Sequence, residues 1–578
     1  TNMIEIDPKN EKRLAMLALC YHHLQDFGAS EKAYKKSLAI KPDYVEAHIN
    51  LGAALKEQGK LKEALEAYNK ALAIKPNNAG AYNNMGATLK EQGKLEEAIK
   101  SYKKALAIKP DYTEAYFGMG VTLQKQGEFE EALEAYNRVL SLRPHHAKAY
   151  NNMGLILYDQ GKLEEALERY NKALAIKFDY AEAWSNGAEA LEKCNKLKEL
   201  SAWLERAFQT LEPIPSDISF MKAKLLWRNK NTKEAIKHIS NIDVETITPI
   251  RKQDYLNLKA KCYEASKDYD LAFNCFEYMN SLAIESNDYL ELDPESYFQS
   301  IREQLASLNS YSLKTPVNHI TEQPDLVPVF LLGFPRSGTT LLDTILRSHS
   351  CVNVVEEQPT VSSAKAFVKK SGYSEIEQIL PQKVIAGARK AYITELDKHR
   401  QSADKKSVLI DKLPLNVLHI PLIQQLYPQA KFILALRHPL DTILSCWMQN
   451  FKLNSAMAIM VDLDRIVDFY CVAMETFQIC RSRYDLDVHE IKYEELVDNL
   501  SAETSSLLSF LGLDWEDQMK HYQKTALKRE HINTPSYSQV IQPIYKNAKY
   551  RWLNYRHQLE PYVERIGPWI NEFHYTQT

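Results

Sequence analysis

The chain has 578 residues, with 72 lysines and arginines against 75 acidic residues, so its formal net charge is only −3. This balance gives no electrostatic reason to expect nucleic acid or a membrane surface as a partner. The sequence contains no run of about 18 apolar residues, so we expect no membrane span. The length is sufficient for roughly three or four domains of about 150 residues each.

The start of the sequence and the cysteines both favour the cytoplasm. The first residues, TNMIEIDPKNEKR, are polar and lack the apolar core of a signal peptide. The eight cysteines form no C-x-x-C pair, and scattered single cysteines are typical of a reducing compartment. We therefore expect a cytoplasmic protein without disulfides and without a metal site.

The first half of the chain repeats with the 34-residue step that separates Pro8 from Pro42. Each unit contains two helical stretches, with small residues where helices approach closely and a tyrosine between neighbours. One such pair cannot bury its apolar face alone, so the units must stack. This period and pattern resemble the tetratricopeptide repeat. The positions that recur are Pro8, Pro42, Pro76, Pro110 and Pro144; Gly52, Gly86, Gly120 and Gly154; and Tyr34, Tyr68, Tyr102, Tyr136 and Tyr170.

Beyond residue 178 the repeat register decays. Residues 178–211 keep Trp184 and Leu197 but have Asn195 in place of the turn glycine. Residues 213–283 still have the pattern of two degenerate helical pairs. We predict an all-α superhelical solenoid, with tetratricopeptide repeats over 1–211 and degenerate helical repeats over 212–285. A polar connecting segment, 286–325, follows.

Asparagines recur on the surface that such a solenoid makes concave. Their amides can bond to the backbone of an extended peptide, and the series resembles the asparagine ladder of protein O-GlcNAc transferases. The alternative is that asparagine is a common repeat residue that supports the helix pair. We keep both interpretations open for the predicted peptide groove. Its residues are Asn50, Asn84, Asn152 and Asn186.

From residue 326 onward, short apolar strands alternate with helical stretches. This pattern indicates a parallel sheet with helices on both faces, and therefore an α/β domain over 326–578. Ligands of such sheets bind beyond the carboxyl ends of the strands. The residues at those ends are Arg336, Lys412, Arg437 and Tyr493. The predicted strands are VPVFLLG (327–333), SVLIDK (407–412), KFILALR (431–437) and DVHEIKY (487–493).

The first strand runs into a glycine-bounded turn and a helix, with the sequence GFPRSGTT (333–340). A turn of this kind holds anions, because backbone N–H groups and the helix dipole both favour negative charge there. The outline is that of a phosphate-binding loop, but Thr339 and Thr340 stand where nucleotide triphosphatases have a lysine. We predict that the loop holds a phosphate-like group and is not built to split the terminal bond of ATP.

This loop and the segment LALRHPLDTILS (434–445) together resemble sulfotransferases that use 3′-phosphoadenosine 5′-phosphosulfate (PAPS). Over 326–578 the pattern is similar to that of tyrosylprotein sulfotransferases. The resemblance implies that the loop grips the 5′-phosphosulfate, that Arg437 and Ser445 hold the 3′-phosphate, and that Ser536 or Ser538 gives a hydroxyl to the transferring group. The residues implied to bind the donor are Pro335, Arg336, Ser337, Gly338, Thr339, Thr340, Arg437, Ser445, Tyr493, Arg551 and Trp552.

The resemblance also implies the catalytic residues. Glu357 follows Arg336 by 21 residues, which is the spacing of the family's catalytic base. Lys412 matches the catalytic lysine, which would neutralise charge on the leaving phosphate oxygen, and Arg336 is the third member. No metal is implied. In the family an arginine two residues after the base reads acidic residues of the substrate, whereas this chain has Pro359 there.

We therefore predict a PAPS-dependent sulfotransferase that releases 3′-phosphoadenosine 5′-phosphate (PAP). Its expected acceptor is a hydroxyl, most simply a tyrosine of a peptide or protein recruited by the solenoid. A carbohydrate or lipid acceptor is the alternative within this class. The alternatives from other classes are an ATP-dependent kinase and a scaffold that senses nucleotide. Repeats upstream of such a domain also resemble bacterial repeat-containing sulfotransferases, so we expect a bacterial protein; a homodimer is left open.

Overall fold

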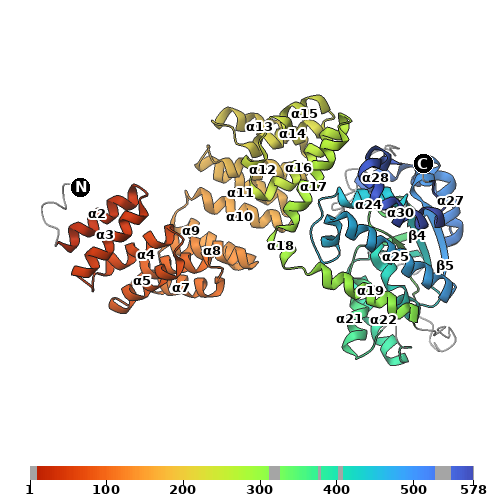
Figure 1. The fold of residues 1–578 in the computed structure, drawn as a ribbon, viewed down its shortest axis with the longest axis horizontal. Coiled ribbons are helices and arrows are strands. Elements are labelled where there is room, and N and C mark those ends of the chain that lie inside the picture. Colours follow the sequence, from red (N-terminus) through yellow and green to blue (C-terminus); the bar gives the residue numbers. More distant parts are fainter. Residues whose placement is uncertain (1–9, 311–325, 375–378, 401–407, 528–547, 577–578) are drawn as a thin grey trace. The chain divides into compact units, whose positions relative to one another are not determined.

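The computed structural model describes residues 10–310, 326–374, 379–400, 408–527 and 548–576. The chain divides into two compact units, 1–246 and 247–578, and each is described by itself (Figure 1). None of the described helices is both long and apolar enough to cross a bilayer.

The first unit is a succession of paired helices, which confirms the predicted solenoid of repeats. Each of the first twelve to be described spans 13 or 14 residues. The helices are α2 (Glu11–His23), α3 (Phe27–Ile40), α4 (Val45–Glu57), α5 (Leu61–Ile74), α6 (Ala79–Glu91), α7 (Leu95–Ile108), α8 (Thr113–Gln126), α9 (Phe129–Leu142), α10 (Ala147–Asp159), α11 (Leu163–Ile176), α12 (Ala181–Lys193), α13 (Leu197–Thr210), α14 (Ser216–Arg228) and α15 (Thr232–Ser240).

The recurring glycines and tyrosines explain why these helices pack closely. Tyr68 is buried between the helices of its repeat, and a Cβ atom added to Gly52 would stand only 2.5 Å from its ring. Gly154 and Tyr170 are related in the same way, also at 2.5 Å. The glycine therefore makes room for the ring, and the ring fills a space that would otherwise be a void.

At the end of the clear repeats, a tryptophan takes over this packing role. A Cβ atom on Gly187 of α12 would stand 2.2 Å from the Trp203 ring, whose Nε1 donates a 2.9 Å hydrogen bond to the Trp184 carbonyl. Because this bond and close packing keep the indole from retreating, we expect Gly187→Ala to lower the free energy of unfolding of the repeat unit by about 1–3 kcal/mol. Urea unfolding followed by tryptophan fluorescence measures the change.

Gly28→Ala is the matched control for this prediction. Gly28 also lies in a helix, α3, but the nearest atom that a Cβ would meet is the Asp26 carboxylate oxygen, at 3.8 Å. Alanine is the better helix former, so this variant should be neutral or slightly stabilised. If the two variants unfold at the same urea concentration, the close contact at Gly187 does not limit stability.

The second unit begins with a helical hairpin, α16 (Pro249–Ala265) and α17 (Tyr269–Ile284). The boundary between the units thus falls inside the segment predicted as degenerate repeats, 212–285. Part of the predicted polar connection, 286–325, is helical as well, because α18 (Asn287–Leu290) and α19 (Pro294–Ser310) lie in it. Phe298 of α19 packs edge-on against Phe469, with ring centroids 5.8 Å apart. A hydrophobic contact thus fixes this helix to the domain.

A five-stranded parallel sheet organises the rest of the second unit, as predicted. The strand order is β2-β3-β1-β4-β5, so β1 lies in the centre, and its loop opens where the chain crosses from one half of the sheet to the other. The sequence patterns located four strands within a residue or two, but they missed β2. The strands are β1 (Val329–Gly333), β2 (Val352–Glu356), β3 (Val408–Lys412), β4 (Lys431–Leu436) and β5 (Asp487–Lys492).

Alternate residues of the central strands enter different cores. Leu331 and Ile433 pack with Leu342 of α20 and Leu507 of α27 on one face. On the other face the Phe330 ring approaches Tyr392 of α22, with centroids 6.2 Å apart. Helices thus cover both faces, which confirms the α/β class. They are α20 (Thr339–Leu346), α21 (Thr360–Lys370), α22 (Gln382–Asp397), α23 (Ile420–Leu426), α24 (Pro439–Trp447), α25 (Leu463–Tyr484), α26 (Tyr493–Asp498), α27 (Leu500–Leu511), α28 (Tyr522–Leu527) and α30 (Arg556–Glu572), with 3₁₀ turns η3 (Pro414–His419), η4 (Met457–Val461), η5 (Asp517–His521) and η6 (Arg551–Tyr555).

Candidate active site

The candidate site begins at the loop between β1 and α20. Arg336 and Gly338 both have left-handed backbone conformations, with φ of 69° and 100°. A Cβ atom on Gly338 would also stand 2.8 Å from Cδ2 of Tyr493, so both the conformation and the close contact require glycine. The loop then delivers Thr339 as the first residue of α20, whose N-terminal N–H groups are left without helical partners.

The loop contains a buried hydroxyl group, that of Ser337, without a hydrogen-bond partner among the described residues. Ser337 is 3% exposed, and within the described part of the chain its Oγ makes no hydrogen bond. A buried hydroxyl without a partner is unfavourable, and it is commonly satisfied by a ligand or water. Thr339 and Thr340 are buried beside it. This cluster of donors at a helix N-terminus suits an anion.

Arg437, at the end of β4, is the second centre of positive charge. One of its terminal nitrogens donates to the Ala548 carbonyl at 2.6 Å, and its guanidinium lies over the Tyr493 ring, 5.2 Å from the centroid. Its Nε is buried and has no partner among the described residues. Arg336 reaches toward the same region, because its Nε donates to Ser445 Oγ at 3.2 Å. The structure therefore brings Arg336, Arg437, Ser445 and Tyr493 together.

The C-terminal segment is attached to this region through Asp441. The Trp552 backbone N–H donates to Asp441 Oδ1 at 2.8 Å, and the Arg437 guanidinium lies 3.9 Å from the other carboxylate oxygen. Burial raises the pKa of Asp441 to about 6, although Arg437 opposes this shift. The Trp552 ring is buried and stacks on His438, with centroids 5.0 Å apart. These contacts fix the Trp552 side chain next to Arg437 and Asp441.

Arg551, the neighbouring residue, is paired with a helix that the sequence did not connect to the site. Its Nε donates to the Glu264 carboxylate on α16 at 2.8 Å. The Tyr555 hydroxyl donates to the same carboxylate, also at 2.8 Å. Ser536 and Ser538, the other predicted residues of this C-terminal stretch, lie outside the described residues.

An ion cluster lies at the ends of β2 and β3. Lys412 Nζ donates to Glu357 Oε1 at 2.7 Å and to Glu356 Oε1 at 3.0 Å. Burial disfavours the charged amine, but the carboxylates of Glu357, Glu356 and Asp343 outweigh it and raise the pKa of Lys412. The Lys412 side chain is fully buried, whereas that of Glu357 is 38% exposed and that of Glu356 only 10%. Glu357 is thus the carboxylate that an acceptor could reach.

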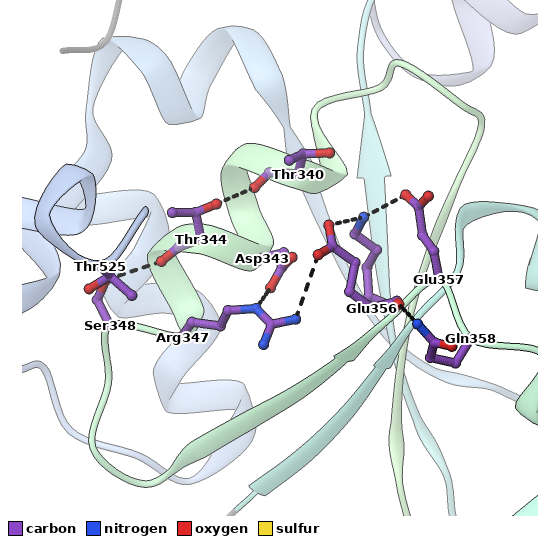
Figure 2. A network of polar contacts seen from close by, with 10 residues as sticks. Thr340, Asp343, Thr344, Arg347, Ser348, Glu356, Glu357, Gln358 and Thr525 are labelled. Atoms are coloured by element: carbon purple, nitrogen blue, oxygen red, sulfur yellow. Dashed lines mark hydrogen bonds and ion pairs between the residues drawn. The ribbon is translucent and has the colours of Figure 1, made fainter. Parts of the chain in front are cut away.

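A second layer of polar residues lies behind this cluster (Figure 2). Arg347 of α20 forms an ion pair with Asp343 at 2.5 Å and lies 4.0 Å from Glu356. Just after the helix and on another side, Ser348 Oγ donates to the Thr525 hydroxyl at 2.8 Å. These contacts hold the helix that follows the anion loop in a fixed orientation to the cluster. The sequence analysis did not single out Asp343 and Arg347, although their i, i+4 spacing on a predicted helix is a signal for an ion pair.

The backbone also constrains Glu357. Its φ of 52° lies in the left-handed region, and its N–H donates to the Lys412 carbonyl at 2.7 Å. Residues other than glycine adopt this conformation at a cost of about 1–3 kcal/mol, and they cluster at functional sites. Glu357 and Arg336 share this property.

The predicted asparagine groove residues belong to the first unit, and all four are half-buried. Asn152 Nδ2 donates to the Tyr136 hydroxyl at 3.1 Å, and Asn186 Nδ2 donates to Asn151 at 3.0 Å. Asn84 accepts from Asn83 at 3.3 Å. These bonds lie within the repeats and favour the interpretation that the asparagines support the helix pairs.

Comparisons with known proteins agree with this architecture. Residues 328–517 match the model of the sulfotransferase family, and the stretches 18–59, 54–93, 87–127 and 111–177 match models of the tetratricopeptide repeat. Residues 328–517 are therefore similar to the sulfotransferase family, and the helices before them are similar to tetratricopeptide repeats. The described residues contain no group of three or more histidines, cysteines or acidic residues that could hold a metal ion.

Several relatives define this similarity further. An uncharacterized protein of Aquifex aeolicus is 30% identical over 53% of this chain, but the match covers only 40% of that protein. Protein-tyrosine sulfotransferase 1 of Danio rerio is 28% identical over 43% of this chain and 72% of its own length. Among solved structures, MamA is 29% identical, with a TM-score of 0.27, over 28% of this chain and 96% of its own.

Proposed function

We propose that this protein transfers a sulfuryl group from PAPS to a hydroxyl acceptor. The observation that carries the proposal is that two candidate anion-binding groups, the loop of Arg336 and the buried Arg437, lie together at the carboxyl ends of the strands. A donor with phosphate groups at both the 5′ and the 3′ positions needs two such centres. When bound, PAPS supplies an activated sulfuryl group.

The residues present fit this donor. Ser337 Oγ and Arg437 Nε are buried donors without partners among the described residues, and phosphate oxygens would satisfy both. Arg336, Ser337, Gly338, Thr339 and Thr340 would hold the 5′ group. Arg437 and Ser445 would hold the 3′-phosphate, with Pro335, Tyr493, Arg551 and Trp552 completing the donor site.

The proposed chemistry uses the ion cluster at the ends of β2 and β3. Glu357 would accept the proton of the acceptor hydroxyl, because its carboxylate is both exposed and held in place by Lys412. Lys412 would neutralise the negative charge that develops on the leaving phosphate oxygen, and Arg336 would add a second positive charge there. A hydroxyl of Ser536 or Ser538 would add a donor to the transferring group.

The proposed acceptor is a tyrosine of a peptide or protein that the repeats of 1–211 recruit. The similarity to protein-tyrosine sulfotransferases supports a tyrosine, at 28% identity for the Danio rerio protein. Pro359 caps α21 at the position where the family reads acidic residues with an arginine, so a carbohydrate or lipid remains the alternative. All cysteines are free, which suits the reducing cytoplasm that we propose as the location.

Thermal unfolding of the full chain tests the donor assignment. A ligand present at about 100 times its dissociation constant should stabilise the native state by about 2.7 kcal/mol. We expect PAP to raise the unfolding temperature of the second unit, and AMP or ATP with Mg²⁺ to have little effect. Arg437→Ala should abolish most of the PAP effect, because the buried cation for the 3′-phosphate is lost.

Arg481→Ala is the matched control for this experiment. Arg481 lies in the last turn of α25, shortly before β5 begins, and it pairs with Glu490. It is therefore on the side of the sheet where the strands begin, away from the candidate site. It should respond to PAP like the wild type. An equal shift with ATP and Mg²⁺ would favour a kinase, and no shift with any nucleotide would contradict the donor assignment.

A further inference from the structure

The helical hairpin α16–α17 is bound to the sulfotransferase-family domain close to the donor site. Asn257 of α16 donates to the Met448 carbonyl at 3.0 Å, and Asn280 of α17 donates to the Trp447 carbonyl at 2.9 Å. Both acceptors lie at the C-terminal end of α24, the helix that carries Ser445, where carbonyl groups lack helical partners. Both asparagines are buried. The hairpin therefore caps a helix of the candidate site.

One face of α16 makes the contacts that bind this helix to the domain. Asp254 accepts from Asn450 at 2.9 Å, Asn257 bonds to Met448, and Glu264 pairs with Arg551. Residues three or four apart lie on the same side of a helix. Lys261 follows Asn257 by four residues and precedes Glu264 by three, so it projects from this face, between the two contacts that lead to α24 and to the C-terminal segment.

Lys261 differs from its neighbours in making no interaction of its own. Its side chain is exposed, and it forms no hydrogen bond or ion pair within the described residues. Glu264 is already engaged by Arg551 and Tyr555, and Asp254 by Asn450. An unpaired ammonium on a face that otherwise makes specific contacts is available to a ligand.

The electrostatic surroundings of Lys261 place it among the cations of the site. Desolvation by the surrounding protein, together with the positive charges of Arg551 and Arg336, lowers the pKa of Lys261 to about 8, although Asp254 and Glu264 oppose this shift. Lys261 as a whole residue is nevertheless exposed on the surface of the hairpin, so part of its side chain is accessible to a ligand. Glu264 and Asp254 offset part of the repulsion among these three cations, and a bound anion would relieve the rest.

We propose that Lys261 is a further anion-binding residue of the sulfotransferase site, contributed by the helical hairpin from outside the family's own domain. Its ligand is an anionic group: the 5′ phosphate or sulfuryl group of the donor, or a carboxylate of the acceptor. If the anion is an acceptor carboxylate, Lys261 would supply the cation that Pro359 does not. This inference rests on the proposed function and assigns a site residue that the family resemblance did not include.

Calorimetric titration of the full chain with PAP is the first arm of the test. We expect Lys261→Met to weaken PAP binding roughly tenfold or more, the usual effect of losing a hydrogen bond between charged groups. Lys261→Arg should restore most of the affinity. Lys259→Met is the control, because Lys259 lies two residues away on another side of α16, with its amine 5.4 Å from the Tyr255 ring centroid.

The second arm separates the two sources of the anion. Binding of a tyrosine peptide flanked by aspartates to the protein–PAP complex is compared with binding of the same peptide flanked by alanines. If Lys261→Met keeps its affinity for PAP but loses the preference for the aspartate peptide, the ligand is the acceptor. If it matches Lys259→Met in both arms while the wild type binds PAP, the inference is overturned and the proposed function stands. If the wild type does not bind PAP, both fail.

Discussion

Glu357→Gln is expected to lower turnover by about 10²–10⁴-fold, while the affinity for PAP stays close to that of the wild type. The amide keeps the size of the side chain but cannot accept the proton of an acceptor hydroxyl. The left-handed backbone and the bond to the Lys412 carbonyl do not depend on the carboxylate, so the loop should keep its conformation. Single-turnover sulfuryl transfer and PAP titration measure the two quantities separately.

Glu356→Gln is the matched control, because it removes the other carboxylate that contacts Lys412. The Glu356 side chain is only 10% exposed and also lies near Arg347, so its role in the cluster is to hold charge in place. We expect this variant to lose stability and to keep most of its turnover. If Glu356→Gln loses turnover and Glu357→Gln keeps it, the assignment of the base is wrong. If both keep it, neither carboxylate is the base.

Lys412→Met is expected to destabilise the second unit by about 3–5 kcal/mol and also to reduce turnover. The substitution removes a fully buried cation and leaves the carboxylates of Glu356 and Glu357 near each other without compensation. Urea unfolding at several pH values, together with turnover at neutral pH, measures both effects.

The sign of the wild-type pH dependence follows from the raised pKa of Lys412. The stability that its ion pairs contribute is fully present below the ordinary lysine pKa of about 10.4, and it is lost as the pH rises through the folded value. Lys398→Met provides the contrast, because Lys398 is exposed and pairs with Glu395 at 2.6 Å. An exposed pair contributes about 0–1 kcal/mol. Equal losses for the two lysines would show that the cluster is not effectively buried.

The sequence predicted the parts of the fold that depend on local pattern. The repeat step predicted the helix pairs, and short, mostly apolar runs predicted β1, β3 and β4, while β5 was predicted from DVHEIKY, which contains charged residues as well. Strand β2 was missed because it is only half-buried at several positions, as an edge strand can be, and because Asn353 interrupts its apolar run. Its position beside β3 is nevertheless what places Glu356 and Glu357 next to Lys412, through the register that pairs Glu356 with Lys412.

The candidate site was predictable where it lies at strand ends. Arg336, Lys412 and Arg437 lie at or just after the ends of strands, and a parallel sheet brings the carboxyl ends of its strands together. Lys261, Glu264 and Asp441 were not predicted, because their positions depend on how helices pack near the carboxyl ends of the strands. Sequence spacing does not encode a contact such as that between Glu264 and Arg551, which are 287 residues apart.

The attachment of the α16–α17 hairpin bears on how such a protein can evolve. Duplication or loss of a whole repeat within the first unit adds or removes a self-similar module and leaves Asn257, Asn280 and Glu264 untouched. The hairpin itself is not interchangeable in this way, since its asparagines bond to specific carbonyls of α24 and its glutamate to Arg551. We therefore expect the number of repeats to vary between related proteins. We expect the α16–α17 hairpin to be kept together with the domain to which it is bonded.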